Sequence, residues 1–189
     1  MKFLKIAGLS TVAALMASPA FAHPGHDVTA GFSAGLSHPF LGADHLLAMV
    51  AVGLWAAQYG GRKGLALPAG FVGGMLAGAA LGFSGTGLPG AESLIALSLV
   101  LFGGALALKA RLPLLQAGAL TFAAGLFHGH AHAVEANGSA LAYVGGFVLA
   151  TALLHAAGGV AGWRLAAVRH VVPLAGGAVA LAGIAMLAG

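Results

Sequence analysis

The sequence contains no cysteine, and charged residues make up only 6% of its 189 positions. The absence of cysteine excludes disulfide bonds, thiolate metal sites and cysteine nucleophiles, so any bound metal must be held by nitrogen and oxygen ligands. An ordinary soluble domain has about 25% charged residues. With 60% hydrophobic residues and a mean hydropathy of +0.99, this composition instead predicts a membrane protein.

Acidic residues are scarce, with four Asp and Glu against eight Lys and Arg. No basic cluster is large enough to bind a nucleic-acid backbone, so we expect no nucleic-acid partner. The chain also lacks a glycine-rich phosphate-binding loop followed by lysine, so we do not expect it to hydrolyse nucleotides. We interpret its basic residues as determinants of membrane topology.

Residues 1–22 are typical of a secretory signal peptide. Two lysines precede a short apolar core, and alanines occupy the small-residue positions before a cleavage site. The core is too short to cross a bilayer, which takes about 20 helical residues. We therefore expect cleavage after Ala22, which leaves residues 23–189 as the mature chain.

The mature chain contains six apolar segments, each about long enough to cross a bilayer. They cover residues 39–58, 65–83, 91–108, 112–131, 139–162 and 171–188. The predicted fold class is therefore an all-α integral membrane protein with six transmembrane helices. The preceding stretch "VTAGFSAGLS" has only ten residues, and we interpret it as a re-entrant or interfacial helix.

Every Lys and Arg of the mature chain falls in or next to alternate loops between the predicted spans. These residues are Arg62, Lys63, Lys109, Arg111, Arg164 and Arg169. By the positive-inside rule these loops are cytoplasmic, so both termini of the mature chain are expected in the periplasm. The signal peptide independently requires the same orientation, and the expected location is the bacterial cytoplasmic (inner) membrane.

Glycine is the other organising feature, with 32 residues in the chain. Gly70, Gly74, Gly78 and Gly82 are spaced four residues apart in the second predicted span. Helices in lipid associate through close backbone approach at small residues. This ridge therefore predicts tight contact with a neighbouring span.

The stretch "FHGHAHAVE" at the outer end of the fourth predicted span carries metal-ligand spacing. On a continuous helix, His128 and His132 lie one turn apart on one face and can chelate one ion, and Glu135 falls on the same face. His130 points away, and we interpret it as a supporting group or a separate surface ligand. A histidine-rich external loop that binds metal casually explains this stretch alone equally well.

The first predicted span favours the metal interpretation, because Asp44 and His45 lie at about the same depth as the pair on the fourth span. His38 is seven residues before His45, about 10 Å along a regular helix. The ligands of one ion lie within roughly 4 Å of one another. Either a break at Pro39 and Gly42 returns His38 to the site, or His38 forms an outer station. Asp44 either binds the ion or orients His45.

Three further histidines could extend a path for the cation. His23 and His26 near the mature N-terminus are candidates for outer capture. His155 lies deep in the fifth span and is a candidate exit ligand, although a packed core histidine is the commoner explanation. Glu92 opens the third span, where it either attracts cations or favours the helix N-terminus.

At these residues the chain resembles the HupE/UreJ family of bacterial nickel and cobalt permeases, over essentially the whole mature chain. The family's two motifs correspond to "HPFLGADH" and "FHGHAHAVE", which supply His38, Asp44, His45, His128, His132 and Glu135. The second motif has one residue fewer before its glutamate than the loose family pattern. The resemblance implies uptake of Ni²⁺ or Co²⁺ for a metalloenzyme such as hydrogenase or urease. The residues alone indicate only a divalent transition metal.

We therefore expect a permease that is not an enzyme and holds no prosthetic group. Its expected partners are a divalent metal ion and the lipid bilayer, and a homo-oligomer is compatible with the sequence. Two other classes stay open: a membrane sensor or store that binds metal without moving it, and a redox protein that holds haem between histidines of two spans.

Overall fold

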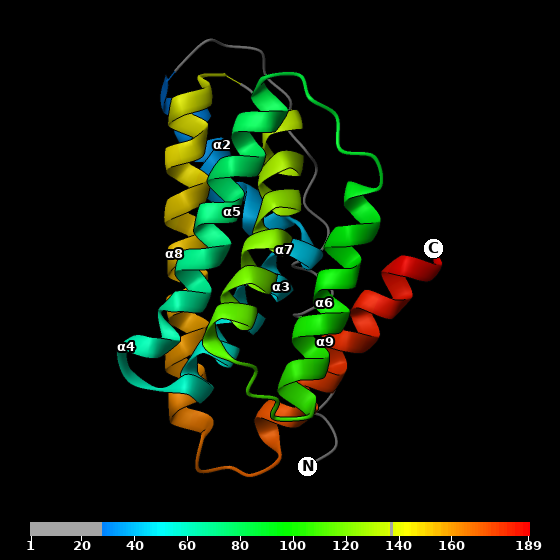
Figure 1. The fold of residues 1–189 in the computed structure, drawn as a ribbon. Helices are drawn as coiled ribbons and strands as arrows, with labels where there is room; N and C mark the ends of the chain where they lie inside the picture. Colours follow the sequence, from blue (N-terminus) through cyan, green and yellow to red (C-terminus); the bar gives the residue numbers. More distant parts are fainter. Residues whose placement is uncertain (1–27, 137) are drawn as a thin grey trace, which may run out of the picture.

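The computed structural model describes residues 28–136 and 138–189, and each of its regular elements there is a helix (Figure 1). The helices are α2 (Val28–Leu41), α3 (Ala43–Tyr59), α4 (Gly61–Gly64), α5 (Ala66–Phe83), α6 (Ala91–Ala107), α7 (Leu114–Val134), α8 (Ala140–Leu165) and α9 (Val171–Ala188). The predicted all-α class is confirmed for this part of the chain. The predicted signal peptide, His23 and His26 lie outside the described residues.

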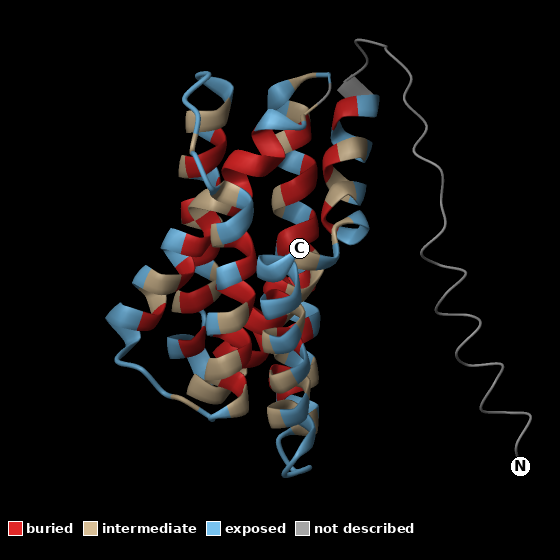
Figure 2. Ribbon diagram, turned by 90° about the vertical axis from the view of Figure 1, so that its right-hand side faces the viewer, coloured by how far each residue is buried: buried red, intermediate tan, exposed pale blue. Residues whose placement is uncertain are grey.

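The helices form a bundle in which α5 packs on α7, α3 and α2 pack on α8, and α6 packs on α9 (Figure 1). Buried residues follow the inward faces of the helices, and exposed residues follow the outward faces (Figure 2). Many outward residues are nevertheless large and apolar; Leu115 and Leu141, for example, are 85% and 83% exposed. An apolar outer surface of this extent is expected where lipid rather than water is the solvent.

Three helical segments are individually long and apolar enough to cross a membrane: Gly61–Phe83, Ala140–Leu165 and Val171–Ala188. Helices α2 and α3 satisfy the same criterion together, as a pair bent by 80°. The apolar helix Ala91–Ala107 is shorter. Length and composition thus support three crossings, or up to four with the bent pair, in the described residues. The full set of six crossings stays a prediction.

The predicted first span, residues 39–58, begins before a break between two helices of the structure. Pro39 lies inside α2, and the chain bends only after Leu41, at Gly42, whose backbone is extended with φ −91° and ψ 116°. Asp44 therefore stands in the first turn of a new helix. Proline is common at the first turn of a helix, which made Pro39 a reasonable start from sequence; in the structure glycine marks the break.

The short segment that precedes this bend is part of the 14-residue helix α2. It lies against α8, where a Cβ added to Gly35 would overlap the backbone of Tyr143, and one added to Gly146 would overlap that of Phe32. This contact fixes α2 beside the bundle and holds its C-terminal end over the start of α3. Whether α2 is re-entrant or interfacial stays a prediction.

The predicted glycine ridge of α5 packs tightly on α7. A Cβ added to Gly74 or Gly78 would overlap backbone carbonyl groups of α7, and Gly125 and Gly129 receive the backbone of α5 in the same way. Only glycine allows such an approach of two backbones. The contact fixes the depth of α7, and with it the position of His128, which lies between the two α7 glycines in sequence.

Candidate metal centre

Four imidazole rings meet where α2 bends into α3. The ring of His45 in α3 lies 4.7 Å from that of His128 and 4.5 Å from that of His132, both in α7. The ring of His38 in α2 lies 4.8 Å from that of His132 and 5.9 Å from that of His45. Of the two arrangements considered for His38, the structure has the one in which a helix break returns it to the cluster.

Two carboxylates join these rings. Glu135 follows the last residue of α7, and its Oε2 lies 3.1 Å from Nε2 of His38. Oδ1 of Asp44 lies 2.8 Å from Nδ1 of His45 and accepts a hydrogen bond from the His45 backbone N–H at 2.7 Å. All six residues of the two sequence motifs therefore lie in one cluster, with one acid beside each of two histidines.

The deepest rings of the cluster have nitrogens that lack any hydrogen bond. His128 and His132 have no exposed surface, and His45 is 6% exposed. Nε2 of His45, Nδ1 of His128 and both ring nitrogens of His132 are buried without a partner. Each such atom costs roughly 1–3 kcal/mol in a folded protein. A cation held between the rings would satisfy their lone pairs, which gives a functional reason for this cost.

Aromatic side chains pack around the deep rings. The ring of His132 stacks on Phe147 with centroids 5.0 Å apart and planes 10° apart. The ring of His128 lies 5.2 Å from that of Phe71. This apolar packing restricts the rotation of both imidazoles and excludes water from one side of the cluster.

In the described part of the chain, no three histidine or acidic side chains are arranged so that they could hold one ion as they stand. The nitrogens of His38 and His45 that face carboxylates are engaged with them, and the rings within the cluster meet edge to face. A cation would therefore enter by displacing these contacts and turning side chains. A site of this kind would release a bound ion readily.

Ser98 in α6 contacts the cluster but was missed by the sequence analysis. Its hydroxyl donates a hydrogen bond to the carbonyl oxygen of Ile95 at 2.7 Å, and its oxygen lies 3.1 Å from Nε2 of His128. Since the single hydroxyl proton points at Ile95, the serine oxygen accepts from Nε2–H of His128. The lone pair of His128 then lies on Nδ1, the buried atom without a partner. The available signal was one polar residue in the apolar run "SLIALSLV".

If the cluster binds a divalent cation, for which Ni²⁺ is a suitable probe, we expect Ser98→Ala to weaken that binding by about 10–100-fold, the usual cost of losing a group that orients a metal-binding histidine. Ser98→Thr keeps the hydroxyl and should retain most of the affinity. Isothermal titration of the purified protein measures both variants. Binding by Ser98→Ala that is as tight as that of the wild type would show that His128 needs no such support.

His130 and His155 lie outside the cluster. Nε2 of His130 lies 2.8 Å from the carbonyl oxygen of Thr86, in the loop between α5 and α6, so its side chain points away as predicted. His155 in α8 is 4% exposed, and neither of its ring nitrogens has a partner. Its ring lies 5.2 Å from that of Phe71, which also lies 5.2 Å from the ring of His128. His155 borders a hollow of about 720 Å³ between α3, α5 and α8.

A second hollow reaches the cluster from the side of the loop before α6. It has a volume of about 540 Å³, and Asp44 and Glu92 both border it, together with the C-terminal end of α9. Asp44 therefore borders this hollow while its carboxylate contacts His45. This gives a cation an acidic approach to the buried imidazoles.

The chain matches known proteins along nearly its whole length. The profile of the family described as HupE / UreJ protein matches residues 11–186. The chain is 42% identical over 191 residues to Protein HupE of Rhizobium leguminosarum bv. viciae, an alignment that covers 98% of this chain and 100% of that protein. No solved structure matches it significantly. The chain therefore belongs to the HupE/UreJ family, whose members are transport proteins and not enzymes.

Proposed function

We propose that the protein is an inner-membrane permease that takes up a divalent transition metal, Ni²⁺ and also Co²⁺, for the maturation of hydrogenase or urease. The observation that supports this proposal is the convergence of four imidazoles and two carboxylates from three helices inside an apolar bundle. Imidazole and carboxylate ligands suit divalent ions of this part of the first transition series. No prosthetic group is needed, since the ion itself is the substrate.

The proposed path begins at the hollow bordered by Asp44 and Glu92, which attracts the hydrated cation. His23 and His26, outside the described residues, would add loose capture ahead of it. The ion then exchanges water for His45, His128 and His132, with Asp44, His38 and Glu135 completing the ligand set as their mutual contacts open. This list of ligands is the one that the two sequence motifs supply.

His155 is the proposed exit ligand. It is buried, it has two nitrogens without partners, and it borders the hollow that extends toward the end of the bundle carrying Arg62 and Lys63. The ring of Phe71 lies 5.2 Å from that of His155 and 5.2 Å from that of His128. On the proposed route the ion would pass this ring, which contacts both histidines.

The membrane potential is sufficient to drive such uptake. By the positive-inside rule the basic end is cytoplasmic, so a cation moves from the periplasm toward the negative side. A divalent ion gains about 4.6 kcal/mol across a potential of about 100 mV, which supports roughly a thousandfold accumulation. Selection among nickel, cobalt, zinc and copper must come from site geometry, because the intrinsic affinity order does not by itself favour nickel.

The direct test uses purified protein in vesicles that enclose a metal-sensitive fluorescent chelator. External Ni²⁺ should quench the dye with saturable kinetics, excess Co²⁺ should compete, and an inside-negative potassium-diffusion potential should accelerate the signal. Vesicles without protein supply the background. Binding without quenching above this background would reject the permease and favour a sensor or store.

The haem alternative is tested on the same preparation by its absorbance spectrum. A histidine-ligated haem gives an intense Soret band, whereas a metal permease gives none. We expect no such band in protein purified from cells supplied with haem precursor. A stoichiometric Soret band would overturn the permease proposal in favour of a redox protein.

A further inference from the structure

Charge is strictly separated between the two ends of the bundle. In the described residues, Asp44, Glu92 and Glu135 all lie toward the end that holds the histidine cluster. The opposite end carries every lysine and arginine that the structure describes: Arg62, Lys63, Lys109, Arg111, Arg164 and Arg169. Within the described residues this basic end therefore has no carboxylate to neutralise it. Any anion that does so must come from outside those residues.

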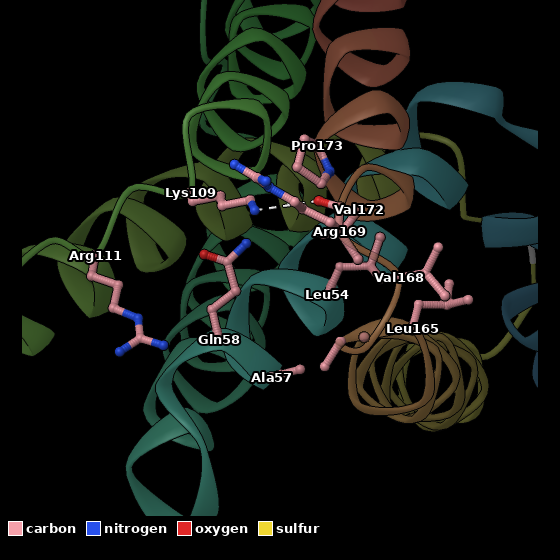
Figure 3. A pocket seen from close by; sticks show the side chains of 12 residues that line it. Leu54, Ala57, Gln58, Lys109, Arg111, Leu165, Val168, Arg169, Val172 and Pro173 are labelled. Carbon is pink, nitrogen blue, oxygen red and sulfur yellow. Dashed lines mark hydrogen bonds between the residues drawn. The ribbon is translucent and has the colours of Figure 1, made fainter.

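Three of these cations surround one hollow of about 270 Å³, which lies between the end of α3, the α6–α7 loop and the α8–α9 loop. Figure 3 shows Lys109 and Gln58 facing the centre of the hollow, Arg169 beside them and Arg111 further to one side. Apolar side chains complete the lining: Leu54, Leu165, Val168, Val172 and Pro173 are among them. The hollow thus joins a cationic part to an apolar part.

Hydrogen bonds hold the walls of this hollow in place. Nε1 of Trp55 donates to the carbonyl oxygen of Ala110, and the hydroxyl of Tyr59 donates to that of Leu112, both at 2.9 Å. Nζ of Lys109 donates to the backbone oxygen of Arg169 at 3.3 Å and so joins the two loops. These bonds fix the cationic groups close together despite their repulsion, which is expected of a preformed anion site.

Gln58 also lines this hollow. Oε1 of Gln58 is buried and has no hydrogen-bond partner. An anion such as phosphate, paired with Lys109 and Arg169, leaves this acceptor unsatisfied unless the ligand also brings a donor. A phosphodiester that carries a hydroxyl group supplies both functions.

The position of the hollow matches the headgroup level of a bilayer. Trp163 lies near the same end, 71% exposed, with the guanidinium of Arg164 5.5 Å from its ring centroid. Exposed tryptophan beside arginine is typical of the membrane interface. Leu174 follows Pro173, which lines the hollow, in the first turns of α9. It is 72% exposed and offers an apolar surface to acyl chains.

We propose that this hollow binds the headgroup of an anionic phospholipid, a hydroxyl-bearing phosphodiester of the phosphatidylglycerol class. Lys109 and Arg169 contact the phosphate, and Arg111 attracts it from further away. The Gln58 side chain turns so that its Oε1 accepts from the headgroup hydroxyl. Basic pockets between transmembrane helices at the cytoplasmic side bind anionic headgroups in this way. The bound lipid ties α3 to both loops. This proposal uses no residue of the metal cluster and is independent of the metal that is transported.

The test is native mass spectrometry of the detergent-purified full-length protein, titrated with phosphatidylglycerol, with phosphatidylcholine, and with inorganic phosphate. We expect one phosphatidylglycerol molecule to bind saturably and more tightly than phosphatidylcholine. Each basic residue near an anionic headgroup contributes roughly fivefold to affinity. The double variant Lys109→Gln/Arg169→Gln should therefore lose about 25-fold in affinity for the first lipid.

The matched control is Arg62→Gln/Lys63→Gln, which removes the same charge from the same end of the bundle. Both residues lie in α4, outside the hollow. This variant should change the affinity for the lipid less than about twofold, because it loses only weak long-range attraction. The charge-preserving variant Lys109→Arg/Arg169→Lys should keep most of the binding, which separates loss of charge from misfolding. Equal losses in the two Gln variants, or no preference over phosphatidylcholine, would overturn the proposal. If inorganic phosphate displaces the lipid, the cationic site is supported. If phosphate binds as tightly as the lipid but leaves the lipid in place, the hollow is a site for a soluble anion and the lipid proposal is overturned.

Discussion

Cells that produce the His132→Ala variant are expected to take up nickel no faster than cells that lack the protein. His132 is completely buried, both of its ring nitrogens lack partners, and its ring contacts those of His38 and His45. It is therefore the histidine that joins the α2 and α3 parts of the cluster to α7. Loss of a group that merely orients a ligand already costs about 10–100-fold in metal affinity, so loss of the ligand should cost at least about 100-fold.

The measurement is uptake of radioactive nickel at limiting external concentration, normalised to the amount of protein in the membrane. His130→Gln is the matched control on the same helix, because His130 contacts the carbonyl oxygen of Thr86 and a glutamine retains a donor for that bond. It should keep uptake close to the wild-type rate. His45→Ala and His128→Ala should behave like His132→Ala. If all four variants transport equally, the cluster is not on the path of the ion.

The parts of this centre that could be predicted from sequence are those fixed by residues close together in the chain. The spacing of His128 and His132 places them on one helix face, and this needs only the α-helical repeat. The depth of Asp44 and His45 follows from the ends of two predicted spans. The chemistry of the site was therefore accessible from residue type and helix geometry, and the structure brings these four residues together.

The position of His38 was not accessible in the same way. It depends on the 80° bend at Gly42, and a glycine three residues after a proline allows a break at either residue. In the structure α2 continues through Pro39 and packs on α8 through Gly35 and Gly146. That tertiary contact, made by a residue more than a hundred positions away, determines where the chain turns. An interpretation of each segment by itself could therefore offer only two alternatives for His38, a return to the cluster or an outer station.

Ser98 illustrates a second limit. Its role arises because α6 lies against α7 at the height of His128, and the order in which apolar helices pack is not encoded by their hydrophobicity when all of them are apolar. The same argument applies to the α5 ridge, whose glycine spacing predicted a close neighbour but not which one. Its partner proved to be α7, the helix that carries the two central histidines.

This coincidence has an energetic consequence for the centre. A helix that presents buried imidazoles without partners gains nothing from those nitrogens until an ion arrives. Its position must therefore be held by other contacts. Gly125 and Gly129 of α7, on either side of His128, are enclosed by the backbone of α5, and Gly74 and Gly78 of α5 are enclosed in return. The glycine contact therefore holds the two buried histidines of α7 in place without any contribution from a bound ion.

Gly78→Ala should therefore be the most destabilising small substitution in the bundle. The added Cβ would overlap the backbone carbonyl of Leu126 and approach the backbone nitrogen of His130 at 2.9 Å, so α5 and α7 must separate. Overpacking against side chains costs typically 1–3 kcal/mol, and here rigid backbone is the obstacle, so we expect about 3 kcal/mol or more. The free energy of unfolding in mixed micelles, with increasing denaturing detergent, measures this loss.

Gly177→Ala is the matched control, a glycine in α9 where an added Cβ meets nothing within 4 Å. Alanine is favoured over glycine in a helix by up to about 1 kcal/mol, so this variant should be as stable as the wild type or more stable. The difference between the two variants isolates the α5–α7 contact from the general preference for alanine. Where Gly78→Ala still folds, the displaced α7 should also bind Ni²⁺ more weakly, while Gly177→Ala binds it normally. Equal stability of the two variants would mean that α7 is positioned by something other than the glycine ridge.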